Sequence, residues 1–127
     1  MLETIKGERN KAILDEYTKI LKRAFKSGKP FRMDDVYREL MEAPAPKFFT
    51  TYRKASFFVK MILNGEIGKI PSGRYRKEMY LEIARRFQQE GAGDIKRIDL
   101  ILEQPAPSFY LSKDSLVRVI CQNIRKR

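Results

Sequence analysis

The chain contains one proline-aromatic segment twice, and this repetition constrains the fold more than any other feature of the sequence. EAPAPKFF at residues 42–49 recurs as EQPAPSFY at residues 103–110, at an offset of 61 residues. The flanking apolar positions align at the same offset, and Tyr17 aligns with Tyr80 at an offset of 63. Self-similarity at a fixed distance indicates repeated structural units. The chain is therefore predicted to consist of two copies of one unit.

Hydrophobic periodicity predicts three helices in the first half. Apolar residues recur at helical spacing over 13–25 and again over 36–41, which indicates a long first helix and a short second one. The prolines of the repeated segment must end the second helix, because proline cannot donate to the helical ladder. Thr50 or Thr51 can cap a third helix, which Gly65 ends. The predicted inner face of this helix is Ala55, Phe58, Val59 and Ile62.

The second half repeats this pattern and completes an all-α fold. Its apolar residues predict helices over 79–87, 95–102 and 116–124. A longer helix, a short helix, a turn and a capped helix make up the layout of a helix-turn-helix unit. The predicted fold is six helices in two duplicated tri-helical, helix-turn-helix-like units. The sequence does not decide whether the two units share one hydrophobic core or have one each. The predicted segments are a first repeat at 1–64, a connector at 65–73 and a second repeat at 74–127.

The residue composition argues against an enzyme. The chain has no histidine, which removes the usual general base near neutral pH and the commonest metal ligand. Its lone cysteine, Cys121, lies among aliphatic residues and is predicted to be a small buried apolar side chain. Gly65, Gly68 and Gly73 do not form a phosphate-binding loop, because no GK[ST] follows them. We expect no enzymatic activity, no cofactor and no bound metal.

The charge balance points to a polyanionic partner. The chain has 27 Lys and Arg residues against 16 Asp and Glu, which leaves a net charge of +11. Such a field concentrates polyanions near the surface, and nucleic acid is the commonest polyanion inside cells. DNA is the preferred partner over RNA, and the alternative is that the charged surface serves only solubility. We expect a cytoplasmic protein without membrane contact, because the sequence shows neither a secretory signal nor a long apolar run.

The helix-turn-helix layout predicts which residues could bind nucleic acid. In such units the last helix lies in the major groove, so the outward side chains of the third and sixth helices are candidates. Basic residues around Tyr75 could hold a strand while the ring stacks on a base. The alternative is that any solvated helix face or linker presents similar residues. The candidates are Arg53, Lys54, Ser56, Phe57, Lys60 and Asn64; then Arg74, Arg76 and Lys77; then Lys113, Arg118, Gln122 and Arg125, followed by Lys126 and Arg127.

The repeated Pro-Ala-Pro segment is predicted to be structural. Fixed proline dihedrals can hold a sharp connection between helices, and Phe48 and Phe109 are expected to insert into the core. Two alternatives stay open. The segment could line a ligand-binding groove, or an exposed Phe57 with its aromatic neighbours could form a protein-interaction or assembly surface, including that of a homodimer.

Three stretches of the chain resemble a poorly characterised family of short basic bacterial proteins. These stretches are EAPAPKFFTT at 42–51, EQPAPSFYLS at 103–112 and the RxxMYxEI pattern from Arg76 to Ile83. Members of the family carry PA-[PS]-x-F-[YW]-[VL]-[ST] once per half. The first copy departs from the pattern at Thr50, where Val or Leu is usual. The resemblance covers most of the chain, but it implies no activity and no functional residues.

Overall fold

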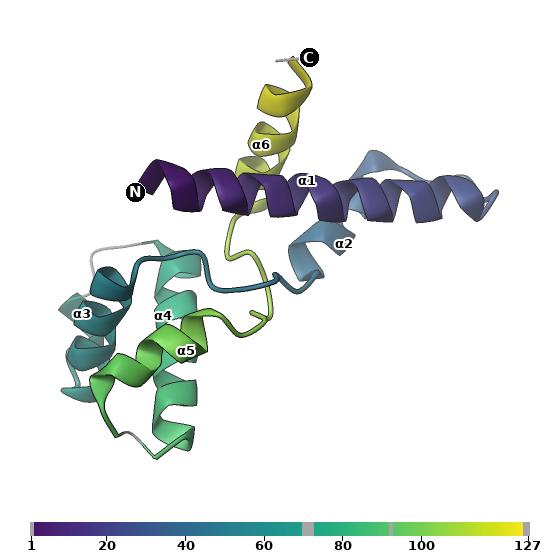
Figure 1. Cartoon of the computed structure of the whole chain (residues 1–127). Coiled ribbons are helices and arrows are strands. Elements are labelled where there is room, and N and C mark those ends of the chain that lie inside the picture. The colour runs from purple at the N-terminus through teal and green to yellow at the C-terminus, as the bar shows by residue number, and fades with distance from the viewer. Residues whose placement is uncertain (1, 70–72, 92, 126–127) are drawn as a thin grey trace.

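The structure is a computed structural model that describes residues 2–69, 73–91 and 93–125 (Figure 1). Within these residues the chain is helical, apart from loops and one isolated β-bridge, so the all-α prediction is confirmed. None of the described helices combines the length and apolar character that a bilayer span requires. The α-helices are α1 (Leu2–Lys26), α2 (Met33–Glu42), α3 (Tyr52–Leu63), α4 (Arg74–Gln89), α5 (Ile98–Leu102) and α6 (Lys113–Arg125). Short 3-10 helices occur at η1 (Ile67–Lys69) and η2 (Ile95–Arg97).

Capping residues, among them the predicted Thr51, set several of the helix boundaries. The Thr51 hydroxyl accepts the backbone N–H of Lys54 at 3.1 Å, which satisfies a donor of the first turn of α3. The Ser112 hydroxyl accepts the backbone N–H of Ser115 at 3.1 Å in the same way at the start of α6. Gly28 follows α1 with a φ of +68°, a left-handed conformation that glycine adopts without steric penalty.

The helices do not pack in chain order. α1 and α2 pack against each other and against α6, whereas α4 and α5 pack against each other and against α3. Figure 1 shows these two groups one above the other, with the chain crossing twice between them. The third helix of each sequence half therefore packs on the first two helices of the other half. The predicted repeats 1–64 and 74–127 are not the units in which the helices pack, and the duplication itself stays a prediction.

The two Pro-Ala-Pro segments meet where the chain crosses. The backbone N–H of Ala45 donates to the carbonyl of Ala106, and that of Ala106 donates to Ala45, each at 2.9 Å. Beyond this bridge, Phe48 stacks on Tyr110 with ring centroids 6.2 Å apart, and Phe49 stacks on Phe109 at 6.4 Å. Phe48 and Phe109 are both buried, which confirms their predicted insertion into the core.

Buried side chains from both helix groups form one core. The cluster includes Ile13 and Ile20 of α1, Leu116 of α6, and Tyr80 and Ile83 of α4. The aromatic residues of the crossing segments belong to the same cluster. The question of one core or two is thereby answered within the described residues: all six helices contribute to a single core.

Arg86 of α4 connects that helix to the crossing. Its guanidinium donates to the carboxylate of Glu82 at 2.8 Å, to the side chain of Gln104 at 3.1 Å and to the carbonyl of Pro105 at 2.9 Å. The same group lies 4.9 Å from the centroid of the Phe48 ring. Hydrogen bonds from Arg85 and Arg86 lower the pKa of the Glu82 carboxyl to about 2.

Two predictions about single side chains were wrong. Cys121 is exposed, because α6 directs Leu116 and Ile120 towards α1 and α2 and so turns the next position outward. Ser56 was expected to face solvent but is buried, since α3 packs against both α4 and α5 and needs a wider inner face. Its hydroxyl has no hydrogen-bond partner among the described residues.

Candidate nucleic-acid interface

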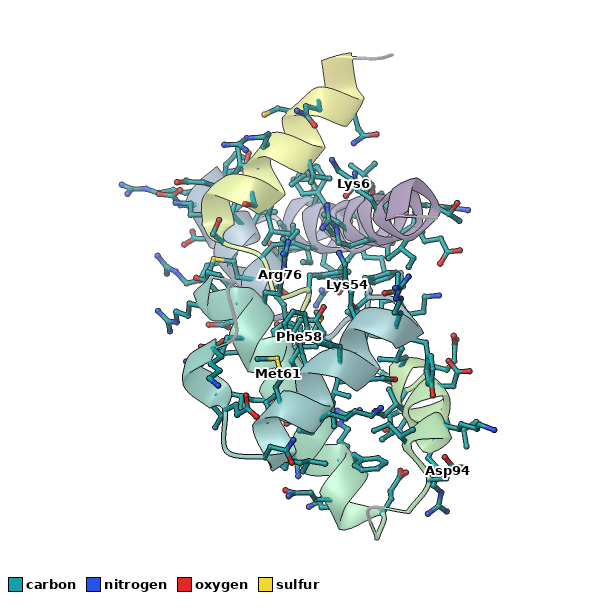
Figure 2. All side chains as sticks on the ribbon, turned by 90° about the vertical axis from the view of Figure 1, so that its left-hand side faces the viewer. Lys6, Lys54, Phe58, Met61, Arg76 and Asp94 are labelled. Atoms are coloured by element: carbon teal, nitrogen blue, oxygen red, sulfur yellow. The ribbon has the colours of Figure 1, made fainter. Side chains whose placement is uncertain are left out.

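A cleft of about 360 Å³ opens between α1, the first turns of α3 and α4, and the extended segments that follow the two prolines. Five of its described lining side chains are cationic, and none is an aspartate or a glutamate. Figure 2 shows Lys6, Lys54 and Arg76, which come from three different helices, gathered on one side of the molecule. We call this site the basic cleft, and its cations are Lys6, Arg9, Lys47, Lys54 and Arg76.

Helix register brings these cations together. Lys6 and Arg9 lie three residues apart in α1 and so share one face of that helix. Lys54 belongs to the first turn of α3, whose position is fixed by the Thr51 cap. Arg76 belongs to the first turn of α4. Because α3 packs along α4 beneath α1, the starts of these two helices form the wall opposite Lys6 and Arg9.

Most of this charge has no carboxylate partner. Lys47 pairs with Glu8 at 2.9 Å, and the hydrogen bond raises the pKa of its amine. The four other cations form no ion pair with any residue in the described part of the chain. Burial, and then the charge of Arg76, lower the pKa of Arg9. The basic cleft thus holds like charges close together, and a bound anion would relieve their repulsion.

Hydroxyl groups and apolar side chains complete the cleft. The hydroxyls of Thr50 and Tyr80 are hydrogen-bonded at 2.8 Å, and burial raises the pKa of the Tyr80 phenol. Ser108 and Thr51 add two further hydroxyl groups to the lining. A site with cations, hydroxyls and some apolar surface suits a ligand that carries both a phosphate and a ring. The apolar lining consists of Ile5, Phe49, Met79, Phe109 and Leu111.

A second, mainly apolar hollow adjoins the basic cleft along α3. It is lined by Arg53, Lys54, Phe57 and Phe58, and we call it the aromatic hollow. Phe57 is 60% exposed and lies edge-on to Phe58, with ring centroids 5.5 Å apart. Phe58 in turn lies 4.5 Å from the ring of Tyr80, which lines the basic cleft. Lys54 lines both sites, so the two form a continuous surface.

The predicted binding residues of α3 lie on the exposed face of that helix, with Ser56 as the exception. Their side chains are exposed, and two of them line the aromatic hollow together with Lys54. Lys54 and Arg76, predicted from different helices, meet in the basic cleft. The exposed predicted residues are Arg53, Lys54, Phe57 and Lys60 of α3 and Asn64, which caps its carboxyl end.

The predicted residues of α6 do not join this surface. Lys113, Arg118 and Gln122 are exposed, but α6 belongs to the other helix group and none of the three lines either site. Lys113 instead forms an ion pair with Asp34 of α2 at 2.7 Å, and this hydrogen bond lowers the pKa of Asp34. The predicted side chain of Arg125, with Lys126 and Arg127, falls outside the described part of the chain.

The basic cluster around Tyr75 is divided by the fold. Arg74 pairs with Glu78 at 3.1 Å and lies 5.6 Å from the centroid of the Tyr75 ring. Lys77 is half-buried. Among the three predicted basic residues of this cluster, Arg76 is the one that lines the basic cleft.

Sequence reasoning missed three cations of the cleft. Lys6 and Arg9 share a helix face, but periodicity could not show which other helix that face meets. Lys47 lies inside the repeated proline segment, where Ser108 occupies the matching position of the second copy. Both residues line the same cleft in the fold. The difference between the two copies at this position is visible in the sequence and could have drawn attention to Lys47.

The chain matches no protein-family model, no curated protein and no solved structure. The resemblance to the family of short basic bacterial proteins therefore stays a prediction.

Proposed function

We propose that the protein binds nucleic acid, DNA in preference to RNA, as a non-enzymatic accessory or regulatory factor of the cytoplasm. The observation that carries this proposal is the basic cleft, where four cations gather without a carboxylate partner in the described residues. Such a cluster costs free energy in the unbound protein through like-charge repulsion. A phosphate backbone would neutralise it and release condensed counterions.

The net charge of +11 supports the same proposal at longer range. A positive field attracts a polyanion before contact and raises the rate of encounter. The exposed lysine, arginine and asparagine side chains of α3 continue the cationic surface away from the cleft. A nucleic acid seated in the cleft would therefore meet further phosphate-binding groups along α3.

A salt titration of binding to labelled oligonucleotides tests this function. Fluorescence anisotropy should detect binding at about 50 mM salt and a decrease of affinity that is linear in log K against log salt. For duplex DNA each neutralised phosphate contributes a slope of about −0.9. If the protein binds neither duplex nor single strand at low salt, the proposed function is wrong.

A second candidate function is protein interaction or self-assembly through α3. Phe57 and Leu63 on α3, Tyr52 at its start and Ile67 just beyond it are large hydrophobic residues with exposed surface. Exposed apolar surface of this kind is typical of interfaces. Small-angle scattering over a concentration series would detect a homodimer. A dimer that Phe57→Ser abolishes would favour this second function over the first.

A further inference from the structure

We infer that the basic cleft and the aromatic hollow together hold an unpaired nucleotide, so that the protein binds single-stranded nucleic acid more tightly than duplex. The inference rests on the proposed function and specifies the form of nucleic acid that the site accepts. Three features carry it: the concave shape of the cleft, the place of α3 in its wall, and the exposed ring of Phe57.

The shape of the basic cleft favours a single nucleotide over a duplex. A volume of about 360 Å³ falls within the range of sites that enclose small ligands. A duplex is a convex rod with its bases stacked inside, and only its phosphate edge could touch the rim of such a site. An unpaired nucleotide can enter and bring its phosphate to Lys6, Arg9 and Arg76 together.

The position of α3 argues against docking into a major groove. A recognition helix presents its amino-terminal residues to base edges from a convex surface. Here Thr51 and Lys54, at the start of α3, line a cleft whose opposite wall is α1. The second candidate helix, α6, belongs to the other helix group, and none of its described side chains lines either site. The first turn of α3 can therefore reach a strand inside the cleft but cannot enter a groove.

The aromatic hollow supplies the stacking surface that an unpaired base needs. Non-specific single-strand sites combine a cationic groove with aromatic rings on which bases stack. Phe57 has 60% of its surface exposed and is held edge-on by Phe58. Lys54 lies between this ring and the basic cleft and borders both. A strand whose phosphate occupies the cleft can thus stack a neighbouring base on Phe57, whereas a paired base would first have to be unpaired and unstacked, at a cost in free energy.

The test compares a thymidine oligonucleotide of about 12 nucleotides with a blunt duplex of the same length, at matched salt. The wild-type protein should bind the single strand more tightly. The double variant Lys6→Gln/Arg76→Gln should weaken single-strand binding about tenfold or more, because both residues contact the phosphate in the cleft. Its slope of log K against log salt should become shallower by about 0.7 for each phosphate that the variant no longer neutralises.

A matched control removes the same charge elsewhere. Lys19→Gln/Lys22→Gln alters two exposed lysines of α1 that lie about 20 Å further along the helix. This variant should change the affinity about twofold or less, since screening limits charge effects at that distance. Phe57→Ala should weaken single-strand binding about fivefold or more and leave the salt slope unchanged, because stacking releases no counterion. Circular dichroism would confirm that each variant keeps its helices.

The outcomes separate the inference from the proposed function. Equal affinity for strand and duplex, or an equal decrease for both in the cleft variant, would overturn the inference and leave nucleic-acid binding standing. Binding of neither form at about 50 mM salt would remove the proposed function as well. Tight binding of thymidine monophosphate without binding of the strand would show a mononucleotide pocket and overturn the inference.

Discussion

Arg9 and Arg76 place two guanidinium groups in one cleft, and none of its described lining side chains is a carboxylate. A half-buried arginine keeps less of its hydration than an exposed one, and a like charge nearby increases the penalty. Arginine side chains that are half-buried next to a like charge therefore destabilise the folded protein when no ligand is bound. Binding sites commonly show this conflict, because the arrangement that suits the ligand is not the arrangement that suits the empty protein.

Substituting one of these arginines should therefore stabilise the protein while it weakens ligand binding. We expect Arg76→Gln to raise Tm by about 2 °C at low salt, because it removes repulsion from Arg9. Differential scanning fluorimetry would measure the change. The gain should shrink at about 1 M salt, where screening is strong. A lower Tm at low salt would show that Arg76 stabilises the fold instead.

Glu82 makes a different kind of contribution, which depends on pH. Hydrogen bonds from Arg85 and Arg86 lower its pKa from 4.5 to about 2 in the folded protein. The ionised form therefore stabilises the fold above pH 4.5, and this stability is lost as the pH falls from 4.5 towards 2. Glu82→Gln should lower the free energy of unfolding by about 1–2 kcal/mol at pH 7.

Urea denaturation across the pH range would test the role of Glu82. The difference between wild type and Glu82→Gln should be constant above about pH 5 and should vanish as the pH approaches about 2. Glu78→Gln is a suitable control, since Glu78 pairs with the exposed Arg74 at the helix surface. A difference that persists unchanged at low pH would contradict the ionic explanation.

At the scale of the element, the helices follow from the sequence and their partners do not. Periodicity, prolines and capping residues such as Thr51 predicted every α-helix, because these signals act within a few residues. An apolar stripe shows that a helix face is buried, but it carries no information on the surface that buries it. The hydrophobic pattern therefore could not predict that α3 and α6 each pack on the first two helices of the other half, an exchange of helices between the halves.

The same limit applied to the candidate site. Lys54 was predicted from the helix-turn-helix layout and Arg76 from the basic cluster around Tyr75, but the prediction could not bring them together or add Lys6 and Arg9. The aromatic residues were easier to place. Phe57 lies on the polar face of α3. A large ring at such a position stays exposed whichever elements cover the apolar face of the helix.

At the scale of the whole molecule, the exchange of helices makes each half depend on the other. Residues 1–69 contain α1, α2 and α3 but lack α6, which covers the first two. Residues 70–127 contain α4, α5 and α6 but lack α3. Neither fragment can bury its apolar helix faces alone, and buried apolar area is the main source of stability.

The two fragments should therefore be unfolded separately and helical together. Circular dichroism of residues 1–69 and of residues 70–127 should show little helix and no cooperative thermal transition. An equimolar mixture should recover helix and a cooperative transition whose midpoint rises with concentration, as expected for a bimolecular complex. A cooperative transition in either fragment alone would mean that its helices pack within the half.

The late position of α6 in the chain has a consequence for biosynthesis. α1 and α2 are synthesised before α3, α4 and α5, yet the helix that covers them follows all of these in the chain. During translation α3, α4 and α5 can assemble as soon as α5 is complete. The apolar stripes of α1 and α2 that α6 covers stay exposed until α6 has been synthesised. Packing of the amino-terminal helices is thus delayed relative to their synthesis, and their apolar stripes expose the nascent chain to aggregation until α6 docks.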